Sequence, residues 1–211
     1  MIKHHLSDAL LFGYAAGTLP EAFSLIAATH VTLCDDCRAR LAAFEALGGA
    51  VVEDTNAAAL SDGALDRAMS RLSSPERRTV SQRRAGMLPA PLQSYIGGDL
   101  DAVRWKTLGM GVRQAILPTS KGATARLLHI PAGRAVPDHG HRGTELTLVL
   151  SGAFHDTVDR FGPGDLEIAT SDLVHTPIAE HGADCICLAA TDAPLRFNSL
   201  IPRLLQPIFR I

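Results

Sequence analysis

Residues 133–152 read GRAVPDHGHRGTELTLVLSG, and this stretch decides the fold of the second half of the chain. His139 and His141 are two residues apart, so on a strand their side chains face the same side, and Glu145 has the same parity. The alternate leucines that follow face the other side. Such a set of donors indicates a divalent metal, for which His175 in LVHTP offers one more ligand. The alternative is a polar face of a solvated strand.

Strand-like runs continue around this stretch, whereas the first third of the chain has a helical pattern. The runs ARLLHIPAG, ELTLVLSGAF, DLEIA and DCICLAA are separated by Gly, Pro and Asp, which is typical of an antiparallel barrel or sandwich. Upstream, Ser7 caps a short helix that stops at Gly17, Pro20 opens a long helix running to Gly48 or Gly49, and residues 61–72 form a third helix.

Charge and composition divide the chain at the same place. Residues 1–73 carry five Lys/Arg and nine Asp/Glu, a net of −4, and residues 92–211 carry eleven and twelve, a net of −1. Residues 74–91 carry four arginines and one glutamate, a net of +3, with three prolines and no apolar periodicity. We therefore expect two domains, an all-α domain over 1–73 and an all-β barrel over 92–211, joined by an exposed linker over 74–91.

The overall composition narrows the function classes. The chain has 211 residues, 46% of them hydrophobic and 20% charged, as in soluble globular proteins. A net charge of −2 gives no broad attraction to nucleic acid or to anionic membrane. No apolar run approaches the roughly 20 residues of a membrane span. The first residues also lack the apolar core of a secretion signal, so we expect a cytoplasmic protein.

The helical half contains a second group of candidate metal ligands in HVTLCDDC. On a continuous helix, with about 100° per residue, His30, Cys34 and Cys37 point into one narrow wedge. Imidazole and thiolate donors together favour zinc, and four protein ligands would make a closed structural site. The fourth donor must come from elsewhere, and His4-His5 is the other source in this half. The alternatives are unrelated helix thiols or a redox CxxC, although the latter needs a βαβ context.

An apolar stripe in the helical half and a pair of cysteines near the end of the chain can each be interpreted in two ways. Leu65, Met69 and Leu72 form an apolar stripe, which is either core or a surface for a partner. Cys185 and Cys187 share strand parity, so they are either small buried residues or thiols at which oxidant chemistry begins.

The second half resembles the cupins. The spacing from Gly133 to His139 and His141, then to Glu145 and Gly152, matches the first cupin motif position by position. The second motif is looser. Its Pro-Gly-Asp is present at residues 163–165, but the usual Pro-x-Gly turn before the later histidine, His175, is missing. Cupins include enzymes, storage proteins and sensors, so the fold alone does not determine the function.

A His-x3-Cys-x2-Cys helical domain followed by a cupin resembles the ChrR-type anti-sigma factors. The resemblance extends over HHLSDALLFGYAAGTLPEAFSL, HVTLCDDCRAR, VRWKTLGMGVRQAILP, PDHGHRGTELTLVLSGAF, DCICLAATDAPLRFNS and LLQPIFRI. It implies a helical domain that binds and inhibits a group IV (extracytoplasmic-function) sigma factor, and a cupin-like domain needed for release by singlet oxygen. It also implies two zinc ions. The ligands would be His5, His30, Cys34 and Cys37 in one domain, and His139, His141, Glu145 and His175 in the other.

Two other function classes compete with this interpretation. One is a metal-dependent cupin dioxygenase or isomerase with an accessory helical domain, which would need an open coordination position. The other is direct DNA binding, which the acidic helical half and the lack of a basic recognition helix oppose. An acidic domain is better suited to a basic sigma factor, in a 1:1 complex.

Overall fold

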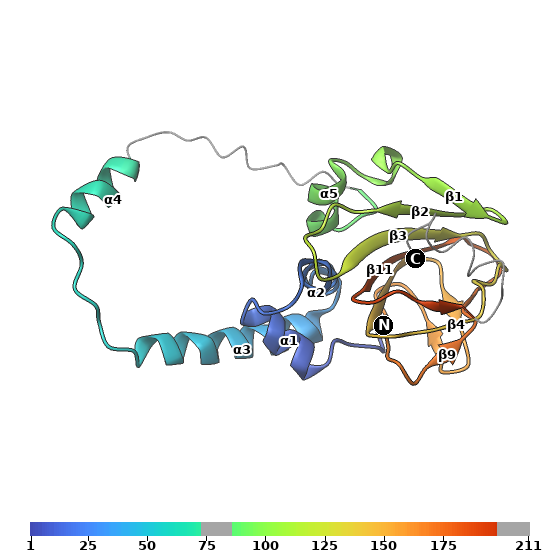
Figure 1. Ribbon diagram of the computed structural model, residues 1–211, viewed down its shortest axis with the longest axis horizontal. Helices are drawn as coiled ribbons and strands as arrows, with labels where there is room; N and C mark the ends of the chain where they lie inside the picture. The colour runs from blue at the N-terminus through green and yellow to red at the C-terminus, as the bar shows by residue number, and fades with distance from the viewer. Residues whose placement is uncertain (73–85, 198–211) are drawn as a thin grey trace.

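The computed structural model describes residues 1–72 and 86–197. Most of the expected linker, and the LLQPIFRI segment, therefore lie outside the described residues. Figure 1 shows helices α1 to α3 packed beside a body of strands, with α4 standing apart from both. The helices are α1 (Asp8–Ala15), α2 (Glu21–Leu33), α3 (Asp35–Glu53), α4 (Ala64–Leu72) and α5 (Ala90–Ile96), followed by a 3-10 turn, η1 (Leu100–Ala102).

The first three helices form where the sequence predicts helix, with one correction. The Ser7 side chain accepts a hydrogen bond from the Leu10 N–H and caps α1, and Gly17 has a left-handed φ of 67° just after it. The expectation of a single helix from Pro20 to Gly48 is wrong. Cys34 has an extended backbone that ends α2 and begins α3, and α3 then continues to Glu53.

Twelve strands form three antiparallel sheets among the described residues. The large sheet has the order β1 (Lys106–Gly109), β2 (Val112–Ile116), β3 (Thr124–Ile130), β11 (Cys185–Thr191), β5 (Glu145–Ser151) and β8 (Leu166–Ala169). The second has β10 (Ile178–Ala179), β6 (Phe154–His155) and β7 (Arg160–Phe161). The third has β12 (Arg196–Phe197), β4 (His139–Gly140) and β9 (Val174–His175). The expected barrel is therefore corrected to open sheets.

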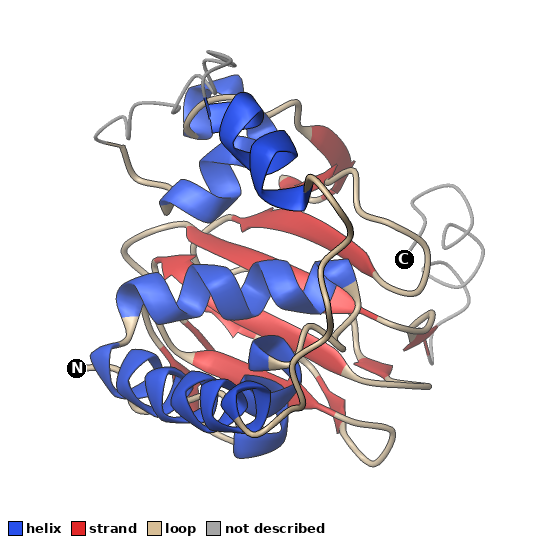
Figure 2. Cartoon of the chain, turned by 90° about the vertical axis from the view of Figure 1, so that its left-hand side faces the viewer, coloured by secondary structure: helices blue, strands red, loops and turns tan. Residues whose placement is uncertain are grey.

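The large sheet is buried on both faces, and this places the helices. In register across three adjacent strands, Leu127, Leu188 and Leu148 are fully buried and belong to one core with residues of α1, α2, α3 and α5 (Figure 2). On the other face, Cys187 and Val149 pair in register and pack with Phe154 in a second core. The helices and the sheet thus share a core rather than folding around two separate ones.

Hydrogen bonds also join the helices to the sheet. The Glu21 carboxylate at the start of α2 accepts from the Tyr95 hydroxyl of α5 at 2.7 Å and from the Ser120 N–H at 2.6 Å. These contacts fix α2 against the sheet at the end opposite to the candidate metal ligands.

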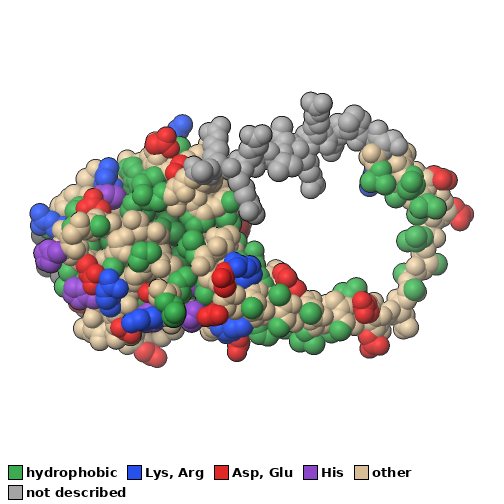
Figure 3. All heavy atoms as spheres, turned by 180° about the vertical axis from the view of Figure 1, so that it is seen from behind, with side chains coloured by type: hydrophobic (Ala, Val, Ile, Leu, Met, Phe, Trp, Pro, Cys, Tyr) green, Lys and Arg blue, Asp and Glu red, His purple; other side chains and the backbone are tan. Residues whose placement is uncertain are grey.

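The end of α3 and the whole of α4 leave this packed body. Figure 3 shows apolar side chains along this arm with no described part of the chain over them. The exposed apolar residues of the arm are Leu47, Val51, Val52, Leu60, Leu65, Met69 and Leu72. No helix in the described ranges is both long enough and apolar enough to cross a membrane.

Candidate metal centres

The structure brings His5, His30, Cys34 and Cys37 together in one group, whose ligand atoms all lie within 4.8 Å of one another. His5 Nδ1 is 3.2 Å from Cys34 Sγ and 3.7 Å from Cys37 Sγ. His30 Nε2 is 3.3 Å from Cys37 Sγ. We call this group the helical centre.

The helical centre depends on the break between α2 and α3. Cys34 is the last residue before α3, and its Sγ accepts a hydrogen bond from the Cys37 N–H. The thiols therefore lie at the start of a helix, where the N–H groups favour negative charge. Because the helix is broken at Cys34, the angle of about 100° per residue does not explain the cluster. The side chains of His30, Cys34 and Cys37 nevertheless converge. His5 reaches them from the segment before α1.

Burial disfavours the charged forms of His30 and Cys37. Burial first, and the nearby His5 second, lower the pKa of His30 to about 4, although the charge of Asp165 partly opposes them. Burial also raises the pKa of the Cys37 thiol to about 11, although a hydrogen bond from the Leu6 N–H acts to lower it. His30 is thus neutral at pH 7 and ready to donate a lone pair.

The distances in the helical centre fit a tetrahedral ion. Zinc bonds of about 2.0–2.1 Å to nitrogen and 2.3 Å to sulfur place tetrahedral ligand atoms about 3.3–3.8 Å apart. Of the three nitrogen–sulfur separations, 3.3 and 3.7 Å lie within this range and 3.2 Å is just below it. Two thiols and two imidazoles can therefore hold zinc with no open position for a substrate.

His139, His141 and His175 form a second group, also within 4.8 Å, which we call the cupin-like centre. His139 and His175 are register partners on β4 and β9, and their rings are 4.7 Å apart. His141 Nε2 lies 3.3 Å from His175 Nε2. All three side chains are buried. His139 Nδ1 donates to the Pro137 carbonyl at 2.8 Å, which leaves its Nε2 with a lone pair for a metal.

Glu145 lies beside this centre and outside the group of three. Its Oε2 is 3.4 Å from His141 Nδ1, and its Oε1 accepts from the Thr147 hydroxyl. Burial raises the pKa of Glu145, but His141, His139 and Thr147 outweigh burial and lower it. The expectation that His139, His141 and Glu145 share one strand is wrong, because β4 ends at Gly140, β5 begins at Glu145, and His141 lies between the two strands.

Two carboxylates that the sequence analysis missed hold His175. Asp156 Oδ2 accepts from His175 Nδ1 at 2.6 Å, and Glu167 Oε1 lies 3.2 Å from the same nitrogen. Burial lowers the pKa of His175, yet these carboxylates raise it to about 9. An acidic residue between Leu166 and Ile168 on a strand was a signal for Glu167, whereas Asp156 lies in a turn and has no such signal.

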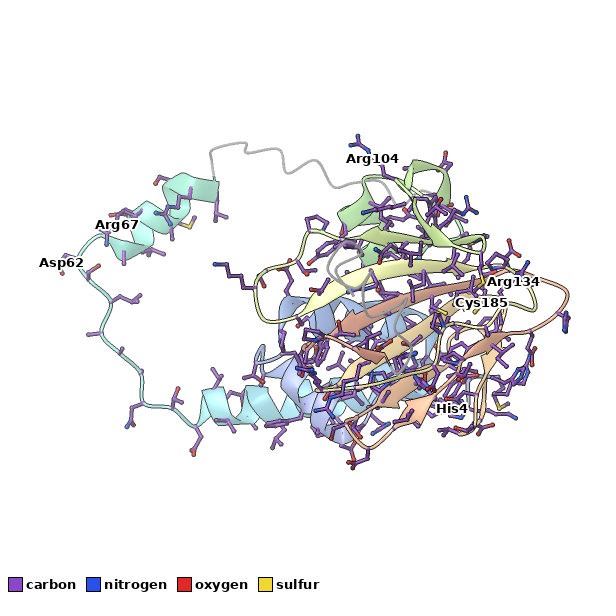
Figure 4. The ribbon with its side chains drawn as sticks, turned by 45° about the vertical axis from the view of Figure 1, so that its right-hand side comes forward. His4, Asp62, Arg67, Arg104, Arg134 and Cys185 are labelled. Carbon is purple, nitrogen blue, oxygen red and sulfur yellow. The ribbon has the colours of Figure 1, made fainter. Side chains whose placement is uncertain are left out.

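Cys185 and Cys187 lie inside the second core, in the strand that Figure 4 marks at Cys185. Their sulfur atoms are 3.5 Å apart, and both side chains are buried. The contact with Cys185 and then burial raise the pKa of Cys187, as do the charges of Glu167 and Glu145. At neutral pH the Cys187 thiol is therefore protonated.

Comparisons with known proteins agree with both halves of this architecture. Residues 93–193 match the model of the family described as the ChrR cupin-like domain. The anti-sigma-E factor ChrR of Cereibacter sphaeroides is 64% identical over 211 residues, which cover 100% of this chain and 99% of that protein. The crystal structure of Rhodobacter sphaeroides SigE in complex with the anti-sigma ChrR contains a chain with 61% identity and a TM-score of 0.83. That match covers 91% of this chain and 100% of the other.

Proposed function

The chain belongs to the ChrR family of anti-sigma factors, and from this premise we propose that it binds and inhibits a group IV sigma factor in a 1:1 complex. Such a partner would place the protein in the cytoplasm. The high identity to a named regulator over the full length disfavours the cupin enzyme as an alternative.

The observation that carries this proposal is the exposed apolar arm. Leu65 and Leu72 on α4 are 70% and 79% exposed, and Val51 and Val52 on α3 are 62% and 69% exposed. A helix of nine residues such as α4 is shorter than the roughly 12–15 residues at which isolated helices are marginal in water. Its apolar stripe therefore needs a partner, and the stripe is a docking surface rather than core.

The charge of the helical half, which includes the arm, suits the same partner. Residues 1–73 carry a net charge of −4, and a protein that contacts DNA presents basic surface. Figure 4 shows Asp62 and Arg67 on the arm well away from the packed body, so a domain-sized partner has access to it.

Two zinc ions complete the proposal. The helical centre would hold one through His5, His30, Cys34 and Cys37, because the donor types and separations suit zinc. The cupin-like centre would hold the other through three histidines, with Glu145 as the proposed fourth ligand. The first ion would stabilise the sigma-binding helices, and the cupin-like domain would be required for release of the sigma factor by singlet oxygen.

Co-expression of the full chain with its group IV sigma factor tests the docking surface. The triple substitution Leu65→Asp, Met69→Asp and Leu72→Asp should weaken the complex at least about 100-fold, since each buried apolar contact contributes about 1.5–3 kcal/mol. Met110→Asp is the matched control, because Met110 is equally exposed but lies on the body. A complex of unchanged affinity in the triple variant would overturn the assignment of the stripe.

A further inference from the structure

The segment before α1 connects the cupin-like half of the chain to the helical centre. We call residues Ile2–Leu6 the leading strap. The N–H groups of Lys3 and His4 donate to Asp165 Oδ1 at 2.6 and 3.0 Å, and the Leu166 N–H donates to the His4 carbonyl at 3.2 Å. Figure 4 places His4 against the strand body, far from the arm. The strap is thus held by the cupin-like part of the chain immediately before His5.

Side-chain packing holds the strap at the same place. The His4 ring is 4.5 Å from the Phe161 ring, and its Nε2 is 3.1 Å from Asp159 Oδ2. Gly164 has a φ of 88°, and a Cβ there would come within 2.5 Å of Ile2 Cδ1. Ile2 therefore occupies the space that the missing side chain leaves.

Asp165 is itself a fixed group. It lies in the turn between β7 and β8, its side chain is buried, and its second oxygen accepts from the Gly162 N–H at 2.9 Å.

On its other side, His5 is followed by a second anchor. The Leu6 carbonyl accepts from Arg40 Nη1 of α3 at 3.1 Å, and Arg40 also pairs with Asp8. Leu6 is buried in the shared core. The backbone is therefore held on both sides of His5, by Arg40 of α3 after it and by Asp165 of the cupin-like turn before it. These two contacts restrict the orientation of the His5 ring.

We propose that Asp165, a residue of the cupin-like half, is a positioning residue for His5 and so sets the metal affinity of the helical centre. The proposal rests on the proposed function of that centre as a metal site. Without Asp165, the strap must be ordered when the metal binds, and the entropy lost in that ordering weakens binding. The cupin-like half thereby holds one ligand of the sigma-binding half.

Titration of the full chain with Co²⁺ tests this proposal with a selective readout. Thiolate–cobalt absorption reports only the helical centre, because the group at the cupin-like centre has no sulfur donor. Asp165→Ala should weaken Co²⁺ binding, measured by competition with a chelator, by about 10- to 100-fold. Glu180→Ala is the matched control, since Glu180 pairs with Arg160 at 2.7 Å on the same half of the chain.

A second variant tests the same contact from the other side. Deletion of Ile2 and Lys3 removes the strap's first anchor and leaves the cupin-like turn intact, so it should lower the affinity to a similar extent. The proposal would be overturned if both variants kept the wild-type Co²⁺ affinity. It would also be overturned if Asp165→Ala lowered the affinity while the deletion left it unchanged. If the wild-type chain showed no thiolate–cobalt band, or if Cys34→Ser with Cys37→Ser left the band unchanged, the metal site itself would be refuted.

Discussion

The two candidate metal centres differ in how far backbone pairing alone positions their ligands. The helical centre draws two thiols and two imidazoles from a helix break and from the strap. In the cupin-like centre, two of the three histidines are register partners on β4 and β9, so backbone pairing sets their spacing. The first ion would therefore join segments that no strand pairing holds together, whereas the second would occupy a frame that is already built.

The largest effect that this comparison predicts is at the cysteines of the helical centre. Cys34→Ser with Cys37→Ser should abolish the complex with the sigma factor, because metal-binding free energy of about 10–16 kcal/mol acts as folding energy in such sites. Co-purification and hydrogen exchange over α1–α3 measure the effect. Cys185→Ser with Cys187→Ser is the matched control and should leave the complex intact. A stable complex without Cys34 and Cys37 would show that the metal is dispensable there.

The second prediction concerns the response rather than the complex. On the hypothesis that oxidant chemistry begins at Cys185 and Cys187, whose sulfur atoms are 3.5 Å apart, replacing both by Ser should abolish release of the sigma factor by singlet oxygen. Release from the purified complex, measured during illumination with a photosensitiser, checks this. Unchanged release would mean that the pair is packing alone.

The two centres also differ in what the sequence predicts. The helical ligands lie close together in the chain, so local spacing predicted His30, Cys34 and Cys37 even though the assumed continuous helix is broken at Cys34. His5 could be assigned only through the family resemblance, because its position depends on the strap. At the cupin-like centre, motif spacing predicted the histidines, although the single strand assumed for them is interrupted after Gly140. Asp156 reaches His175 through tertiary packing that no local pattern encodes, whereas the acidic residue between two apolar ones on β8 was a signal for Glu167.

The same limit applies to the architecture. Alternation of apolar residues predicted the cores of β3, β5, β8 and β11, but not the short strands β9 and β12, which have two residues each. Nor could the pattern show that both faces of β5 are buried, one against the helices. The sequence predicts which segments are strands better than it predicts which layers cover them.

The third prediction concerns the carboxylates behind His175. Asp156→Ala combined with Glu167→Gln should weaken zinc binding at the cupin-like centre by about 10- to 100-fold, since the pair orients the ring through its Nδ1. Chelator competition in the Cys34→Ser, Cys37→Ser background isolates this centre. Asp172→Asn is the control, an exposed carboxylate on the turn before β9. If the double variant and the Asp172→Asn control bound zinc with equal affinity, Asp156 and Glu167 would have no part in orienting His175 for the metal.

The smallest expected effect is coupling between the two centres. Strand β8 carries Leu166, which binds the strap through the His4 carbonyl, and Glu167, which contacts His175, so one strand touches the surroundings of both centres. His175→Ala should therefore lower Co²⁺ affinity at the helical centre by about fivefold, at the weak end of typical coupling free energies of about 1–3 kcal/mol. His129→Ala, which removes a histidine paired with Asp184 at 3.0 Å on β3, is the control. If His175→Ala and His129→Ala lowered the Co²⁺ affinity equally, the cause would be general destabilisation. If neither lowered it, the strap would hold His5 without transmitting the state of the cupin-like centre.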